Sequence, residues 1–552
     1  MDSNRLSHDQ DIRFACMQRL VKLFGEWNGS WESTKGPALL IAFGYCLLVG
    51  VALSRHEMWR DEMEAWLIAR DSESIRQLLG TLQNEGHPAL WYLLLTPLTR
   101  LSYAPEAMQV LHLGIATLTV YLVSRYAPLS RLQLMLFPLG FYILWQYAVV
   151  SRDYALGILL LVMFCALYPI RYRLFPLVGL VLMLAAHTHA LVLMLVTAIG
   201  IGLAVDVGGA IARDRSAFDS MHIRGFVLGF ALIAIGVATS LLHLIPDSHY
   251  VGPTDSTARD LRSHALAIGT ISFVGLAGIL FLLCWLQDRL SFVLVCGLGI
   301  IGVVLYLDAS VLGAIVGAPG VKAFALVGLA AHLFFLYQVR DRFSLLILYG
   351  FGLTGLLVFF SGIFSGGPHH HGMLFVIFFV GYWLERLTRP AALNPVRGRQ
   401  GQILDIVVTL ILVSQSLFGI RVAYQDLTMP YSNGKSVAQY IQSHGWQSKP
   451  IVGCLDFSAQ AVVGYLGIKN IYYPQGERWG SYIVWDQKRR ENVGLDNCLQ
   501  SAQSLGKDVL VVSSYAEEAP LRSFPFDKVA EFKGAIREDE NFVLYRSRQW
   551  TQ

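Results

Sequence analysis

Charged residues are scarce in this chain, which is 552 residues long but contains only 15% Asp, Glu, Lys and Arg. A soluble globular domain usually has about a quarter of its residues charged. Hydrophobic residues make up 54% of the sequence, and long apolar stretches recur from residue 37 to about residue 420. Many of these stretches are about 17–25 residues long, the length of a helix that crosses a ~30 Å hydrocarbon core. We therefore predict an integral membrane protein.

The chain also has little excess charge and little cysteine. Its net charge of +4 gives no reason to expect a nucleic-acid partner. The seven cysteines show no close metal-ligand spacing. Cys454 and Cys498 lie in the polar C-terminal part, where they would form a disulfide only if that part faces an oxidising compartment. Residues 1–36 lack the short apolar core and small-residue cleavage site of a signal peptide.

The apolar stretches predict about thirteen transmembrane helices. We place them near residues 37–54, 105–124, 132–150, 154–170, 174–188, 189–206, 225–246, 264–286, 290–307, 317–338, 343–361, 372–386 and 403–420. The stretch 88–103 is also apolar, but it is short and contains Pro88 and Pro97. We expect it to form a helix that lies on the outer membrane surface.

The distribution of arginine in the loops predicts how the chain is oriented. One set of alternate loops is rich in arginine, as in 171–173 and 213–224, whereas the opposite short loops, with the long loop 55–104 left aside, hold only Arg152, Arg259 and Arg262. Because basic residues favour the cytoplasmic side, we expect the arginine-rich loops and the N-terminus to be cytoplasmic. The long loop 55–104 and the C-terminal part then lie on the outer face.

We therefore expect an all-α polytopic membrane domain followed by a soluble α/β domain. A cytoplasmic N-terminal segment would cover 1–36, the membrane domain 37–421 with a first outer loop at 55–104, and the outer-face domain 422–552. In the last of these, short apolar runs predict strands. They are Pro450–Cys454, Asn470–Tyr473, Val509–Ser513 and Asn541–Tyr545, with a helix over Ser436–Gln442 among them.

Unusual polar residues gather at the outer face of the predicted membrane domain. They are Arg60–Glu62, Glu85–Pro88, Ser151–Tyr154, His187–His189, Asp308, Lys322 and Gly366–His371. Each has an ordinary explanation by itself: Arg152 can extend to the interface, and the histidines can bond nearby carbonyl groups. Ionisable groups at membrane depth are costly, however, and so many of them on one face indicate a functional cavity.

Several of these motifs resemble one known family. Trp59-Arg60-Asp61-Glu62, followed about twenty-five residues later by Gly86-His87-Pro88-Ala89-Leu90, resembles the first outer loop of the C-type (GT-C) glycosyltransferase superfamily. The nearest branch contains bacterial enzymes related to protein O-mannosyltransferases and the lipid A aminoarabinose transferase. Arg152-Asp153-Tyr154-Ala155-Leu156 and His187-Thr188-His189-Ala190 are similar to two further stretches of that branch. Asp153 and Ala89 stand where the branch usually has proline.

The resemblance implies an enzyme that transfers a sugar from a polyprenyl-phosphate donor in the membrane to the hydroxyl of a lipid, glycan or protein. Such a reaction needs a base for the hydroxyl proton and positive charge for the departing phosphate. Asp61 matches the essential aspartate of the family and is the expected base, with Glu62 as its neighbour and catalytic helper. Arg152 suits the phosphate because a guanidinium engages two oxygens at once. The weaker candidates for binding the donor are His87, Lys322, His187, His189 and His370.

Some relatives hold a divalent metal ion near the aspartate. If this chain does so, Asp61, Glu62 and His87 are the ligands that the resemblance suggests. Two other functions fit the same compartment: a transporter or flippase of lipid-linked glycans, and a glycan ligase or polymerase that uses a polyprenyl carrier. The sequence indicates neither the sugar nor the acceptor.

Overall fold

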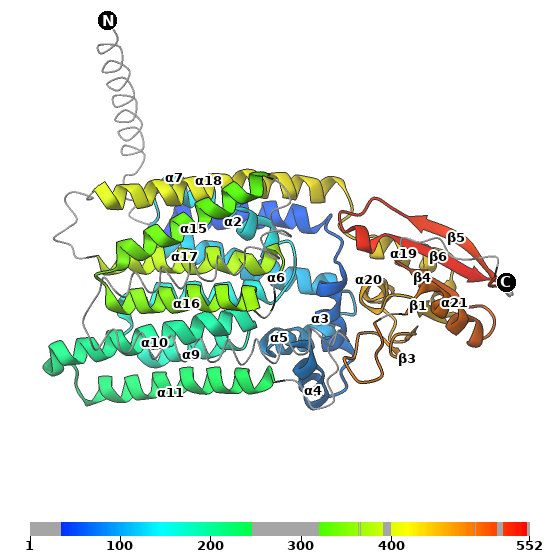
Figure 1. The fold of residues 1–552 in the computed structure, drawn as a ribbon, viewed down its shortest axis with the longest axis horizontal. Helices are drawn as coiled ribbons and strands as arrows, with labels where there is room; N and C mark the ends of the chain where they lie inside the picture. The colour runs from blue at the N-terminus through cyan, green and yellow to red at the C-terminus, as the bar shows by residue number, and fades with distance from the viewer. Residues whose placement is uncertain are drawn as a thin grey trace, which may run out of the picture.

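The computed structural model describes residues 35–245, 319–362, 364, 366–389, 399–491, 493–515 and 523–548, and it shows a helical bundle with a sheet domain at one end (Figure 1). The helices of the bundle and its connecting loops are α2 (Lys35–Leu53), α3 (Arg60–Asp71), α4 (Ile75–Glu85), α5 (Leu90–Leu101), α6 (Glu106–Tyr126), α7 (Arg131–Leu136), α8 (Tyr154–Leu167), α9 (Phe175–Ala186), α10 (Ala190–Arg213), α11 (Ser220–His243), α15 (Pro319–Val339), α16 (Phe343–Gly362), α17 (Pro368–Thr388) and α18 (Arg399–Thr428). We call the end of the bundle that meets the sheet domain the domain end, and the opposite end the far end.

Six of these helices are long and apolar enough to cross a membrane: α2, α6, α10, α11, α16 and α18. The described residues thus contain fewer such helices than the thirteen expected. The expected spans 264–286 and 290–307, the segment 1–34, Arg259, Arg262 and Asp308 lie outside these residues. Helices α8 and α9 are apolar but only 14 and 12 residues long. Their lengths are therefore about 20 Å, short of a full bilayer core.

The expected continuous span at 132–150 is wrong. The chain there forms α7, a 3₁₀ turn η1 (Phe137–Leu139) and a single π-helical turn η2 (Tyr142–Gln146). Pro138 lacks the N–H that an α-helix needs, and α18 crosses so closely here that a Cβ at Gly419 would strike the backbone of residues 139–141. The segment therefore bends around α18.

The stretch 88–103 forms the 12-residue helix α5, which is too short to cross a bilayer. It follows α4 within the connection between α2 and α6 and packs against α3. The backbone N–H of Leu90, at its first turn, donates to the carbonyl of His187, 3.0 Å away, before α10. The first long connection of the chain thus forms a layer of helices at the domain end.

The C-terminal part is a six-stranded mixed sheet with helices, as expected for an α/β domain. Its elements are α19 (Gly434–Ser443), η6 (Trp446–Ser448), β1 (Ile451–Gly453), α20 (Asp456–Leu466), β2 (Ile471–Tyr473), β3 (Arg478–Gly480), α21 (Leu495–Ser504), β4 (Leu510–Ser513), β5 (Phe526–Phe532), η7 (Glu538–Glu540) and β6 (Phe542–Ser547). The strand order is β3-β2-β1-β4-β6-β5, in which β1 runs parallel to β2 and β4 and the other pairs are antiparallel. The four expected strands and the helix at 436–442 are confirmed, whereas β3 and β5 were not expected.

The two faces of this sheet belong to different cores. On one face, Ile451, Leu510 and Leu544 join the apolar core that continues into the helical bundle. On the other face, Val452, Val511 and Tyr545 form a separate small core with α21. This alternation is the two-residue period of a strand. The sheet domain is therefore docked on the bundle by one covered face.

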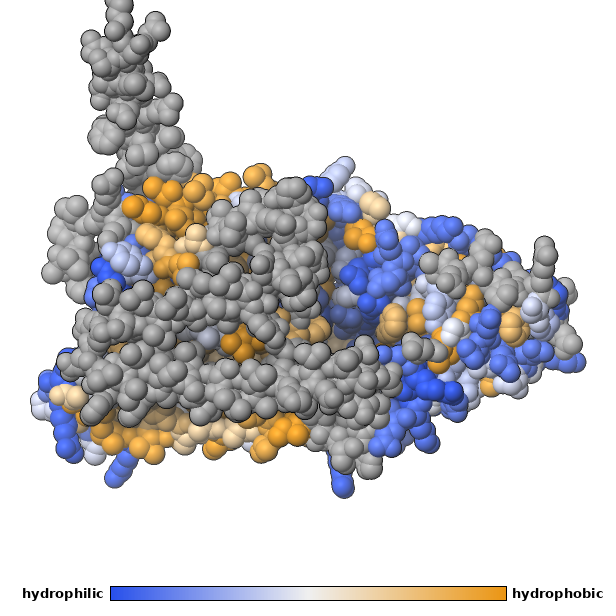
Figure 2. Space-filling view, in the orientation of Figure 1, coloured by the Kyte–Doolittle hydropathy of each residue, from blue (hydrophilic) through white to orange (hydrophobic). Residues whose placement is uncertain are grey.

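Helix α20 joins the sheet domain to the bundle. It packs on α3, and a Cβ at Gly464 would strike the side chain of Met63. The surface of the described residues is apolar along the sides of the bundle and hydrophilic over the sheet domain (Figure 2). An apolar flank with a polar end piece is the surface expected of a protein that is partly embedded in lipid.

Candidate active site

Asp61 and Arg152, the two residues that the sequence favoured most, meet at the domain end. The Asp61 carboxylate accepts a hydrogen bond from Arg152 Nη1 at 2.7 Å, although 91 residues separate them in the chain. Asp61 lies in the first turn of α3, where the helix dipole favours a carboxylate. The side chains of Asp61 and Arg152 are 28% and 13% exposed, so the pair is partly open to solvent.

Arg152 is held by a turn that a buried histidine braces. His112 of α6 donates through Nδ1 to the carbonyl of Ala148 at 2.9 Å, and its Nε2 accepts the backbone N–H of Arg152 at 3.2 Å. The Arg152 side chain then reaches Asp61 on one side and lies 3.5 Å from His369 Nε2 on the other. No sequence signal marks His112, since one histidine in an apolar helix usually satisfies an internal hydrogen bond.

Glu62 is placed differently from the expectation that it assists Asp61. Its side chain is fully buried, and its Oε1 accepts the backbone N–H of Ser151 at 2.6 Å. Its Oε2 lies 3.0 Å from His56, whose other ring nitrogen lies 2.9 Å from Asp426 at the end of α18. Burial alone lowers the pKa of His56, but these two carboxylates outweigh it and raise the pKa to about 10. Glu62 is thus a positioning residue that ties α3 to α18 and to the Arg152 turn.

The histidines expected to bind the donor separate into two groups. His189 and His370 lie against Tyr154, next to Arg152, and His87 lies against His189; the rings of His189 and Tyr154 have centroids 4.2 Å apart. His187 does not join them, because its ring bonds Thr239 of α11 at 3.0 Å. Lys322 lies in α15, but its side chain is outside the described part of the chain.

The expected metal ligands Asp61, Glu62 and His87 are not brought together. Asp61 is paired with Arg152, and Glu62 is enclosed by His56. Within the described part of the chain, His87 instead lies beside Asp153 and His189, with one ligand atom from each residue within 4.8 Å of the others. Asp153 is the residue that stands where the resembling branch has proline.

The sheet domain reaches to within one residue of Asp61. Arg60 Nη1 forms an ion pair with Asp539 at 2.7 Å, and the backbone N–H of Arg60 donates to Glu540 at 3.0 Å. Glu540 is buried, which raises its pKa to about 8, and its other oxygen accepts the hydroxyl of Ser432 at 2.6 Å. The sequence offered no motif that assigns these residues to the site, because the contact depends on how the domain docks.

Two further carboxyl groups lie in the connection between α2 and α6, one near the pair and one near the first. Glu64 is one helical turn after Asp61, and burial raises its pKa to about 7, with the charge of Asp61 adding to the effect. Glu85, at the end of α4, is close to Glu64, and burial raises its pKa well above the usual value. Among the residues that the structure describes, neither buried Oε1 atom has a hydrogen-bond partner. The polar motifs of the sequence include Glu85, but no site motif marks Glu64.

Comparison with known proteins assigns no family to this chain, so the arrangement of these residues is the main evidence for its function. The sequence matches no protein-family model, and no curated protein matches it.

Proposed function

We propose that this chain is a membrane glycosyltransferase that moves a sugar from a polyprenyl-phosphate donor to an acceptor hydroxyl. The observation that carries the proposal is the 2.7 Å contact between Asp61 and Arg152. These residues belong to two separate motifs of the resemblance to GT-C enzymes, and the chemistry needs a base and a phosphate-binding cation side by side. The fold supports it, since the apolar helix α8 begins two residues after Arg152 and could guide a lipid-borne donor to this pair.

In the proposed reaction the acceptor oxygen forms a bond to the anomeric carbon as the bond from that carbon to the phosphate oxygen breaks. Asp61 accepts the proton of the acceptor hydroxyl, and Arg152 stabilises the negative charge that stays on the polyprenyl phosphate. Attack from the face opposite the phosphate inverts the anomeric centre. The atoms and charges balance with no further reactant.

The resting ion pair gives this mechanism an order of events. With no donor bound, Arg152 occupies an oxygen of the Asp61 carboxylate that would accept the proton of the acceptor. A donor phosphate competes for the same guanidinium, because Arg binds phosphate through two parallel hydrogen bonds. Donor binding therefore frees Asp61 to act as the base, so proton removal is coupled to the presence of the donor.

The orientation that we propose places this site on the outer face of a bacterial inner membrane. The arginine-rich loops fall at the far end, where Arg171 pairs with Asp206 of α10 at 2.7 Å. Asp206 is 17 residues beyond His189 along α10, which puts it about 25 Å away. By the positive-inside rule the far end is cytoplasmic, and the sheet domain then stands outside, where it contacts the acceptor.

The test is a transfer assay with the purified full chain in lipid vesicles. A panel of labelled polyprenyl-phosphate sugars is offered with a membrane and glycan extract as acceptor, and release of polyprenyl phosphate is measured. We expect release by the wild type and a loss of about 100- to 10,000-fold in Asp61→Asn. Asp206→Asn, which breaks the similar ion pair at the far end, is the matched control and should retain wild-type release.

Equal release by Asp61→Asn and the wild type would exclude Asp61 as the base. Movement of an intact lipid-linked glycan across the vesicle membrane, with no release from any donor, would replace the proposal with a flippase. Release with the whole glycan joined to the acceptor would identify a ligase or polymerase instead.

A further inference from the structure

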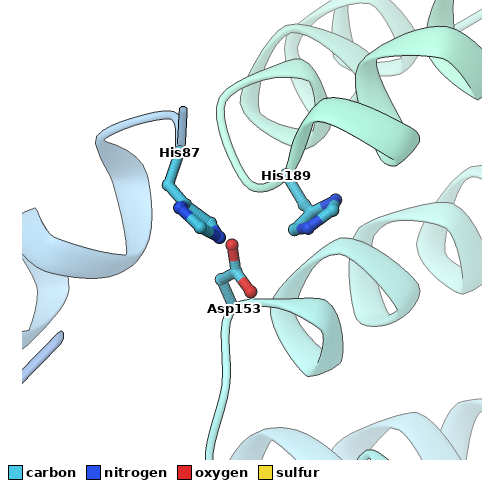
Figure 3. A group of neighbouring side chains, drawn as sticks. All are labelled: His87, Asp153 and His189. Carbon is cyan, nitrogen blue, oxygen red and sulfur yellow. The ribbon is translucent and has the colours of Figure 1, made fainter. Parts of the chain in front are cut away.

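His87, Asp153 and His189 point toward one another from three separate elements (Figure 3). His87 follows α4, Asp153 precedes α8, and His189 is the residue before the first turn of α10. One ligand atom from each lies within 4.8 Å of the other two. The group is beside Arg152 but shares no residue with the Asp61–Arg152 pair.

The carboxylate of Asp153 lacks the partners that a buried carboxylate needs. Asp153 is 3% exposed, and neither of its oxygens accepts a hydrogen bond from the residues that the structure describes. A buried charge without a partner is strongly unfavourable, so buried carboxylates normally pair or coordinate a metal. Both carboxylate oxygens of Asp153 therefore face the space between the two histidines without a hydrogen-bond donor from the described part of the chain.

His87 has the arrangement of a metal-binding histidine. Its Nδ1 lies 2.9 Å from the carbonyl of Glu85, so Nδ1 carries the proton and donates it. The lone pair is then on Nε2. Metal-ligating histidines usually donate their second nitrogen to a carbonyl or carboxylate in this way, which fixes the ring and its tautomer.

His189 serves a second purpose in this structure, since its Nδ1 accepts the backbone N–H of Leu191 at 3.0 Å. Coordination of a metal by this ring weakens or replaces that helix-capping bond. Loss of one such bond lowers metal affinity by about fivefold. Because this loss is small, His189 can still serve as the third ligand. Its helix-capping role and its metal-binding role can also be separated by mutation.

We propose that His87, Asp153 and His189 bind a divalent transition-metal ion of the zinc class. Two imidazoles and one carboxylate form the ligand set of open zinc sites, in which a fourth position stays free. Magnesium and calcium prefer sets made of oxygen atoms. The test of this site is independent of the proposed glycosyl transfer, because it measures metal binding alone.

The experiment uses the full chain, purified in detergent with an affinity tag that contains no histidine and stripped with EDTA. The protein is dialysed against dilute ZnCl₂, and bound zinc is measured by mass spectrometry after desalting. We expect one zinc ion per chain with micromolar or tighter affinity, and at least a tenfold weaker affinity in Asp153→Asn and His87→Gln. Cobalt(II) in place of zinc should give the visible absorption of a four-coordinate site.

Two variants sharpen the assignment. His189→Asn keeps a good helix-capping residue but removes the imidazole, so it should lose affinity like His87→Gln. His187→Gln is the matched control, because that ring bonds Thr239 and should bind zinc as the wild type does. All variants are first compared in EDTA by gel filtration and thermal melting to show that they fold.

Absence of stoichiometric zinc in the wild type would overturn the proposal. So would equal affinity in folded Asp153→Asn and the wild type. Binding that is lost in His371→Gln but unchanged in Asp153→Asn would assign the metal to the triple histidine of α17 and would also overturn it.

Discussion

Within the described residues, several carboxylates at the domain end of the helical bundle lack the cations that surround a buried carboxylate at the far end, although Glu62, also at the domain end, is paired with His56. At the far end, Glu385 is fully buried and has Arg342, Arg386 and Arg389 within 4.0 Å. At the domain end, Glu64, Glu85 and Asp153 form no ion pair within that distance among the residues that the structure describes. Along α17, Glu385 is 16 residues beyond His369, so about 24 Å separates the two environments.

This difference separates charges that maintain the fold from charges that await a ligand. A buried carboxylate surrounded by arginines is costly to disturb, because removal of one partner leaves the others uncompensated. A buried carboxylate without a cation destabilises the protein unless it is protonated or a ligand neutralises it. The unpaired carboxylates at the domain end therefore lower the stability of the fold, and a role in binding a ligand accounts for their presence there.

The largest effect is expected when the far-end cluster is broken. Glu385→Ala should destabilise the protein by about 3–5 kcal/mol, because three arginines lose their shared carboxylate. Asp153→Asn, measured in EDTA, should leave stability unchanged or raise it. Tryptophan fluorescence during thermal unfolding of both variants in detergent would check this, and equal losses would show that the two ends do not differ.

The next effect concerns two arginines that each pair with an aspartate. Arg152→Lys should lower sugar transfer by about 100- to 1,000-fold, since lysine lacks the planar fork that binds phosphate. Arg171→Lys, whose partner Asp206 lies at the far end, should change transfer by less than about twofold. Initial rates at saturating donor would decide. A similar loss in both variants would mean that ion pairs support only the fold.

The smallest effect is a dependence of stability on pH that arises at the domain end. Burial raises the pKa of Glu64 from 4.5 to about 7 and raises that of Glu85 as well. Between these pH values the folded state therefore holds protons that the unfolded state has released. The resulting stabilisation, measured as free energy of unfolding, is fully present below about pH 4.5 and is lost as the pH rises through about 7.

The double variant Glu64→Gln, Glu85→Gln should flatten that part of the curve. Melting temperatures between pH 4.5 and 8 would measure it, with each variant compared with the wild type at the same salt concentration. Parallel curves for wild type and double variant would place the pH dependence elsewhere.

Much of this architecture could be predicted from the sequence because hydropathy and strand patterns are local. The apolar stretches marked α2, α6, α10, α11, α16 and α18, and the C-terminal runs marked four of the six strands. The break at 137–146 was missed because it depends on the approach of Gly419, which lies far away in the chain.

The candidate site was predictable only in part, for the same reason. Asp61 and Arg152 belong to short motifs that can be recognised without a structure. His112 and Glu540 do not, because their roles come from contacts across 40 and 480 residues of chain. The contact of Glu62 with His56 was not predictable, because the motif that contains Asp61 and Glu62 says nothing about the direction of the Glu62 side chain.

Helix α18 has a consequence for how this protein tolerates changes in length. It runs 30 residues without a break, about 45 Å, from the far end to the sheet domain, and Asp426 near its end accepts bonds from His56 and Trp145. The sheet domain is thus attached through a rigid rod rather than a flexible linker. One residue inserted within the rod would rotate everything beyond it by about 100°, whereas seven residues, close to two full turns, would nearly restore its phase. Its length is therefore subject to a periodic constraint that an ordinary interdomain linker does not have.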